Sequence, residues 1–175
     1  AGAYNPNNGS ALGKFQAAMQ IRRSSNLNCI NSVAIGWPIG LIIDGEKGNT
    51  VKDAKDKKFK LQNVYFAGMD AIGTDANKIY GDYLYDAAQK KDIDKNQKSY
   101  SNTFFFSEPG NKYFDSWASL VGTDGYTPIA GSPLLGAASF AGWTGFDTVS
   151  YIGAFDGSTN WMSGWTNFDP QNAKY

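Results

Sequence analysis

The segment Ile30-Asn31-Ser32-Val33-Ala34-Ile35-Gly36 decides the fold, because a similar segment follows at Leu61-Gln62-Asn63-Val64-Tyr65-Phe66-Ala67. From Ile30 to Leu61 the offset is 31 residues. Each segment alternates with the two-residue period of a half-buried strand and ends on a small residue. A pattern that recurs every ~20–50 residues is typical of a solenoid, in which each turn of chain packs on the next. The repeat therefore predicts short parallel strands stacked around a common axis.

The chain around these two repeats supports the same geometry. Residues 37–45 contain a second short strand, which is entered through Pro38 and left at Asp44-Gly45. Strand, corner, strand is the order that a β-helix coil requires. A further strand is predicted over residues 19–23. The alternative interpretation is that the two similar segments are ordinary strands of a β-sandwich.

Three side chains of the repeats have expected roles. Asn31 and Gln62 occupy equivalent places in the alignment, and their stacked amides are expected to hold successive coils in register. Cys29 is the only cysteine, and we expect it to be buried as a small apolar residue rather than reactive. A single cysteine forms no framework of disulfides.

Composition limits the classes of function. The chain has 175 residues, enough for one domain, and its 16 basic and 16 acidic residues cancel. No net field therefore points to nucleic acid or an anionic membrane. Histidine is absent, which excludes imidazole from any catalytic or metal-binding proposal. We predict no nucleic-acid partner, no metal site, no cofactor and, since no apolar run approaches ~18 residues, no transmembrane segment in this chain.

Between the repeats and the last third the sequence predicts two excursions and one buried strand. Residues 46–60 alternate lysine with aspartate and are expected to form an exposed loop. Residues 76–88 carry apolar side chains four apart, as on one face of a short helix. Residues 103–106 are a continuous apolar run, which is typical of a buried strand.

The last third of the chain changes to small and aromatic residues. The final coil of a solenoid has no neighbour above it, so an atypical segment has to close it. We therefore assign residues 1–130 to β-helix coils with an insertion near 70–100, and residues 131–175 to a final coil and C-terminal cap. The predicted fold class is all-β, a right-handed parallel β-helix with a short helical excursion and an aromatic cap.

Three tryptophans of this tail are candidate binding residues. Aromatic rings stack on the apolar faces of sugars, so Trp161 and Trp165, with Trp143 nearby, would form a platform for a glycan. The alternative, which the sequence favours, buries these rings as the plug of the last coil. Exposure of the two indoles decides between the interpretations. Arg22 and Arg23 are further candidates for contact with a glycan or partner, although solvated arginines are the commoner case.

The segments QIRRSSN (20–26), GWPIGLIIDG (36–45), YIGAFD (151–156) and WMSGWTNF (161–168) resemble the C-terminal part of a family of surface or secreted right-handed β-helix proteins of Bacteroidota and other Gram-negative bacteria. Members are frequently outer-membrane lipoproteins, and most are uncharacterised. The turn at residues 131–133 also resembles one found in pectate-lyase-like chains. The resemblance implies a β-helix at the cell surface, and a signal sequence, a lipid-bearing cysteine and earlier coils before residue 1. It implies no catalytic residues.

The sequence thus favours a non-enzymatic surface or secreted protein, structural or adhesive, that binds a glycan or a protein partner. One alternative is a carbohydrate-active enzyme of the pectate-lyase-like class, with Asp70, Asp75, Arg22 and Arg23 as the available residues. No two acidic residues occupy equivalent positions in adjacent coils, so we assign no catalytic residue. A second alternative is an accessory subunit of an outer-membrane complex, docked through the open end or flank of the solenoid.

Overall fold

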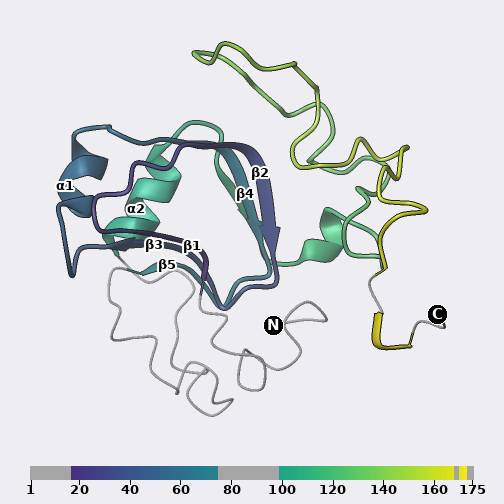
Figure 1. The fold of residues 1–175 in the computed structure, drawn as a ribbon, viewed down its shortest axis with the longest axis horizontal. Coiled ribbons are helices and arrows are strands. Elements are labelled where there is room, and N and C mark those ends of the chain that lie inside the picture. The colour runs from purple at the N-terminus through teal and green to yellow at the C-terminus, as the bar shows by residue number, and fades with distance from the viewer. Residues whose placement is uncertain (1–16, 75–98, 168–169, 173–175) are drawn as a thin grey trace.

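Two parallel sheets form the body of the protein (Figure 1). The structure is a computed structural model that describes residues 17–74, 99–167 and 170–172. Sheet A has the order β1-β3-β5 and sheet B has the order β2-β4-β6. The strands are β1 (Ala17–Arg22), β2 (Cys29–Ile35), β3 (Ile39–Asp44), β4 (Leu61–Ala67), β5 (Ala71–Thr74) and β6 (Lys112–Phe114). Because the chain alternates between the sheets, the arrangement is consistent with a parallel β-helix.

The two similar segments are neighbours in sheet B. They form β2 and β4, which pair in parallel as predicted. The register differs from the prediction by one residue, because Cys29 lies opposite Leu61, 32 residues later. The expected pairing of Asn31 with Gln62 is therefore wrong. Asn31 is stacked on Asn63 instead, whose Nδ2 donates to Asn31 Oδ1 at 3.2 Å.

A left-handed residue in each strand explains the shifted register. Asn31 has a φ of +47° and Asn63 has a φ of +53°, a conformation in which asparagine is several-fold enriched. Such a residue interrupts the two-residue alternation. Leu61, Val64 and Phe66 therefore all face one core, although the first two are three positions apart. A strict alternation assigns these side chains to different faces, and so misaligns the repeats.

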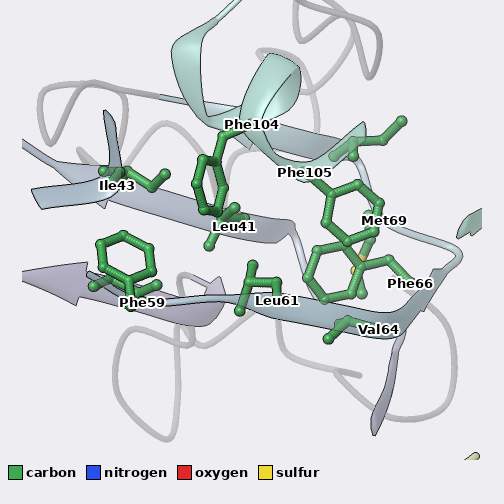
Figure 2. Packing of buried hydrophobic residues seen from close by; sticks show 12 residues of the cluster. Leu41, Ile43, Phe59, Leu61, Val64, Phe66, Met69, Phe104 and Phe105 are labelled. Carbon is green, nitrogen blue, oxygen red and sulfur yellow. The ribbon is translucent and has the colours of Figure 1, made fainter. Parts of the chain in front are cut away.

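The core between the sheets is completed by helix α2 (Tyr100–Ser107) (Figure 2). The ring of Phe105 stacks on Phe66 with a centroid distance of 4.5 Å and an angle of 8°. Phe104 packs against Phe59 at 5.4 Å. The helix thus supplies apolar side chains to the level of the stack that follows β3 and β4.

The predicted strand over residues 103–106 is wrong, because this run lies inside α2. Ser99 Oγ accepts a hydrogen bond from Asn102 N at 3.0 Å and caps the start of the helix. Pro109 disfavours a helical conformation for the residue before it, and the helix ends there. Consecutive side chains of a helix point in different directions, so Phe104 and Phe105 are buried whereas Phe106 is 51% exposed.

The charged excursion is only partly a loop. Residues 46–60 contain a short helix, α1 (Thr50–Lys55), and Ala54 and Phe59 anchor it to the core. The lysines are exposed as expected. Asp53 is the exception, since Lys58 Nζ lies 2.6 Å from its Oδ1 and this hydrogen bond lowers the pKa of the carboxyl. The helix predicted over residues 76–88 lies outside the described residues.

The tail covers the outer face of sheet B (Figure 1, green to yellow). After β6 the described chain consists of turns and two short 3₁₀ helices, Trp117–Ser119 and Pro170–Asn172. Tail residues form a second apolar cluster with the outward side chains of β2, β4 and β6; its buried members are Tyr65, Ala67, Leu120, Val121, Leu134 and Ile152. Residues 131–167 contain no strand where the structure describes them, and their assignment as a final coil and cap stays a prediction. Within the described ranges, no helix is long and apolar enough to cross a membrane.

Candidate functional site

Four aromatic rings form a continuous row in the tail. Tyr126 contacts Phe155 at 5.1 Å, Phe155 stacks on Trp161 at 5.6 Å with an angle of 19°, and Trp161 contacts Trp165 at 5.7 Å. Exposure rises along this aromatic row, from the buried Phe155 to 49% for Trp161 and 69% for Trp165. The interpretation that buried these two indoles as a plug is therefore wrong. They lie where an aromatic surface faces solvent.

Internal hydrogen bonds hold both exposed indoles. Trp161 Nε1 donates to Ala154 O at 2.9 Å, and Trp165 Nε1 donates to Trp161 O at 2.7 Å. The polar edge of each ring is thus satisfied within the chain. What each ring presents to a ligand is its apolar face, and the bonds restrict the ring to one orientation. A ligand that stacks on such rings loses less side-chain entropy on binding.

An aspartate turn sets the position of Trp161. Asp156 Oδ1 accepts from Ser158 N at 2.8 Å and from Thr159 N at 2.7 Å. The backbone hydrogen bonds from Thr159 and Ser158 lower the pKa of Asp156 to about 2. A lowered pKa means that the turn is stabilised fully above pH 3.8, the usual value, and loses this stabilisation as pH falls through about 2. At neutral pH the turn is ionised and closed.

A matching turn sets the other end of the row. Asp124 Oδ1 accepts from Tyr126 N at 3.1 Å and from Thr127 N at 3.0 Å. Asp124 and Asp156 are each followed by glycine, and Gly125 and Gly157 have φ values of +83° and +85°. Each end of the aromatic row is therefore presented by an Asp-Gly turn.

A cleft of about 430 Å³ adjoins the inner end of the aromatic row. It lies between β2 and the tail, and Tyr126 and Phe155 belong both to its lining and to the row. None of the residues that line it is charged; they are Asn31, Ser32, Val33, Ile35, Val121, Gly125, Tyr126, Pro128, Leu134, Ile152, Gly153, Ala154 and Phe155. The cleft and the row together form one uncharged surface that leads from a recess to the exposed indoles.

The stacked asparagines attach the tail to sheet B. Asn31 Nδ2 donates to Ser139 O at 3.1 Å, and Ser139 N donates back to Asn31 Oδ1 at 3.0 Å. Gly153 N donates to Asn31 O at 2.8 Å, and Asn63 Nδ2 lies 3.4 Å from Ala137 O. One column of amides thus pairs the coils and also positions the segment that leads to Phe155.

The third candidate tryptophan has a different setting. Trp143 Nε1 donates to Gln62 Oε1 at 3.1 Å, and the Trp143 ring lies near Phe146 and under Lys60 Nζ. Gln62 also donates to Ser139 O at 3.2 Å. Trp143 therefore fastens the tail to β4 instead of extending the aromatic row.

The two candidate arginines adjoin α1, whereas the aromatic row belongs to the tail. Arg22 Nε lies 3.6 Å from Asp44 Oδ2, and Asp44 is its register partner in sheet A. Arg23 stands in a turn with a φ of +52°, next to Ser24, which hydrogen-bonds the residues that begin α1. The structure does not unite the arginines and the exposed tryptophans in one site.

The carboxylates considered for catalysis do not converge where the structure describes them. Asp44 is buried and accepts from Gln20 Nε2 at 3.1 Å. Asp70 directly precedes β5, and Asp75 lies outside the described residues. In the described ranges no three metal-binding side chains gather into a group. These positions neither support nor oppose catalysis elsewhere in the chain.

Sequence analysis missed Tyr126 and Phe155 as members of the site. The available signal was the pair of Asp-Gly turns, each of which places an aromatic ring a few residues later. It also missed the cleft, because β2 and the tail are more than a hundred residues apart at the contact between Asn31 and Ser139. The site is defined by geometry alone, since no protein-family model, curated protein or solved structure matches the chain.

Proposed function

We propose that this protein binds a glycan through the aromatic row and acts as a non-enzymatic structural or adhesive protein. The observation that carries the proposal is the exposure of Trp161 and Trp165, at 49% and 69%, in a fixed and continuous row of rings. Aromatic side chains normally bury most of their area, and contiguous exposed apolar surface marks interaction sites. An indole face matches the apolar face of a pyranose ring in size and shape.

The surroundings of the indoles favour a sugar over an apolar protein surface. Ser158, Thr159 and Asn160 precede Trp161, Ser163 lies between the two indoles, and all four are exposed. Hydroxyl and amide groups beside a stacking ring can bond the hydroxyls that surround a sugar ring. The mixture of apolar faces and small polar side chains is that of a glycan site.

The proposal includes the scaffold and the location. We take the parallel sheets as coils of a right-handed solenoid with a helical excursion, closed by the aromatic tail. The resemblance to surface β-helix proteins supports placing the protein outside the cell, secreted or attached to the outer membrane. Such a scaffold would hold the aromatic row on the cell exterior, where a glycan or a glycan-bearing partner is accessible.

The test uses the full chain and a double variant, Trp161→Ala with Trp165→Ala. Affinity electrophoresis against a panel of soluble neutral and acidic polysaccharides should show retardation of the native protein by at least one of them. Loss of two central tryptophans typically costs about 2 kcal/mol or more, so the double variant should bind at least ~30-fold more weakly. Urea unfolding of both proteins should show that the double variant remains folded.

Phe146→Ala is the matched control, because Phe146 is 53% exposed in the same tail but contacts Phe140 and Trp143. Its retardation should equal that of the native protein. Unchanged binding by the double variant, or no binding to any polysaccharide, would refute the proposal. Depolymerisation of a polysaccharide, abolished by Asp70→Ala, would replace it with the carbohydrate-active enzyme.

A further inference from the structure

We infer that the glycan is neutral and that the aromatic row discriminates against acidic polysaccharides; this inference rests on the glycan binding proposed above. Its first support is the charge of the tail. Residues 113–173 contain five aspartates and no glutamate, lysine or arginine, whereas the whole chain is balanced. All sixteen basic residues except Lys174 therefore precede the tail. The aromatic row belongs to the one region of uniformly negative charge.

The second support is where two of these charges lie. Asp124 donates its carboxylate to the turn that presents Tyr126, and Asp156 does the same for the turn before Trp161. A carboxylate therefore stands at each end of the segment between Tyr126 and Trp161. Hydrogen bonds from Ser158 and Thr159 keep Asp156 ionised at any pH at which the protein would be assayed. Uronate or sulfate groups on a bound chain would pass within a screening length, ~8–10 Å, of these charges.

The third support is the cleft beside the row. Its lining contains no cation, and the basic groups nearest to this part of the fold are committed to other rings. Lys60 Nζ lies 5.9 Å from the centre of the Trp143 ring, and Lys112 Nζ lies 5.5 Å from that of Tyr65. A carboxylate that entered the cleft would lose hydration without gaining a cation, which is strongly unfavourable. Neutral hydroxyls carry no such penalty.

The arginine pair does not change this conclusion. Acidic glycans are usually recognised through arginine, whose guanidinium matches carboxylate and sulfate groups. Arg22 instead lies beside the buried carboxylate of Asp44, at the α1 corner of sheet A. The residues suited to acidic glycans and the residues suited to sugar stacking thus belong to different parts of the molecule.

The experiment compares polysaccharides that share a backbone and differ in charge. Hydroxyethyl cellulose and carboxymethyl cellulose form one such pair, and neutral galactan and galactomannan with polygalacturonate and alginate complete the panel. We expect retardation by one or more neutral members. We expect at least ~10-fold weaker binding to the charged partner at low salt, from like-charge repulsion, and a smaller difference at high salt.

A second variant tests the cause of the discrimination. Asp124→Asn with Asp156→Asn keeps an oxygen acceptor for each turn but removes both charges. Its binding to neutral chains should stay within about twofold of the native protein, while its discrimination against charged chains should shrink. Retention of full discrimination by this variant would overturn the role of the two aspartates.

The outcomes separate this inference from the proposal on which it rests. Binding to polygalacturonate or alginate that depends on Trp161 and Trp165 and exceeds binding to every neutral chain would overturn neutrality while leaving glycan binding intact. Absence of any tryptophan-dependent glycan binding would overturn both. Concentration-dependent dimerisation abolished by the tryptophan double variant, in sedimentation experiments without glycan, would assign the row to a second copy of the chain and overturn both as well.

Discussion

Phe105→Ala is expected to lower the free energy of unfolding by ~3–5 kcal/mol, the usual cost of removing a buried phenylalanine. Phe105 is fully buried and stacks on Phe66 in the core between the sheets. The cavity would open between α2 and β4, where the surrounding strands are held by parallel pairing and can close it only partly. For a domain of ordinary stability this is a third or more of the total. Urea denaturation monitored by circular dichroism measures the loss.

The neighbouring residue is a matched control. Phe106 lies in the same helix, has the same chemistry and is 51% exposed, so Phe106→Ala should change stability by less than ~1 kcal/mol. The comparison also distinguishes the helix from the strand that the apolar run suggested. In a strand Phe104 and Phe106 would share a face and Phe105 would point away. A larger loss for Phe106→Ala than for Phe105→Ala would contradict the helix.

Gly110→Ala is expected to cost ~3 kcal/mol, because it combines backbone strain with displacement of a neighbour. Gly110 has a φ of +73°, and the register of β4 with β6 places it beside Asn63. An added Cβ would lie 1.7 Å from Asn63 Oδ1. The Asn63 amide would have to move, and would lose its hydrogen bonds to Asn31 and Ala137. Each such bond contributes ~1 kcal/mol, and left-handed strain adds ~1–2 kcal/mol.

Gly136→Ala separates these two contributions. Gly136 has the same φ of +73°, and an added Cβ there meets nothing within 4 Å. Its replacement should therefore show the strain alone, ~1–2 kcal/mol. The difference between the two variants in denaturant midpoint, at equal slope, reports the displacement of Asn63. Equal losses would show that the Asn63 amide is not packed against the third coil.

The strands were largely predictable because they are buried. Residues 39–44 and 61–67 carry the β-branched and aromatic side chains that favour a pleated, enclosed surface, and the structure has strands at both places. The parallel pairing of the two repeats followed from their similarity. Local alternation and burial coincide in these segments, so a pattern of two residues was sufficient.

The register was not predictable from hydrophobicity, because it depends on backbone conformation. Asn31 and Asn63 are 32 residues apart, as are Gly36 and Gly68, and all four have positive φ. Aligning these left-handed residues would have given the observed pairing. Aligning the apolar residues gave an offset one residue too short, since a left-handed residue shifts the side chains that follow to the other face.

The helix and the site required information that local patterns lack. Thr103–Phe106 suits a buried strand in composition, and only Ser99 and Pro109, which start and stop α2, indicate otherwise. The exposure of Trp161 and Trp165 depends on how the tail lies on sheet B, which is determined by contacts such as Asn31 with Ser139 over a long sequence separation. Tryptophan-rich segments are compatible with a buried plug and an exposed platform alike. The residue types were therefore identified, but their exposure was not.

A disulfide between β2 and β4 tests the stacking on which the whole account depends. Cys29 lies opposite Leu61, and both side chains belong to the core between the sheets. Neighbouring strands are ~4.8 Å apart, within the range that a disulfide spans. Burial raises the pKa of the Cys29 thiol, so a Leu61→Cys variant would be oxidised in alkaline buffer and mapped without reduction.

The register of 32 residues predicts an intramolecular disulfide in the Leu61→Cys variant. It also predicts a reduced pair in the Lys60→Cys variant, whose new side chain would lie on the exposed face of the next position. Circular dichroism of the reduced proteins would show that both variants fold. A disulfide that forms with Lys60→Cys and not with Leu61→Cys would contradict the stacking of Asn31 on Asn63, and with it the attachment of the tail that presents the aromatic row.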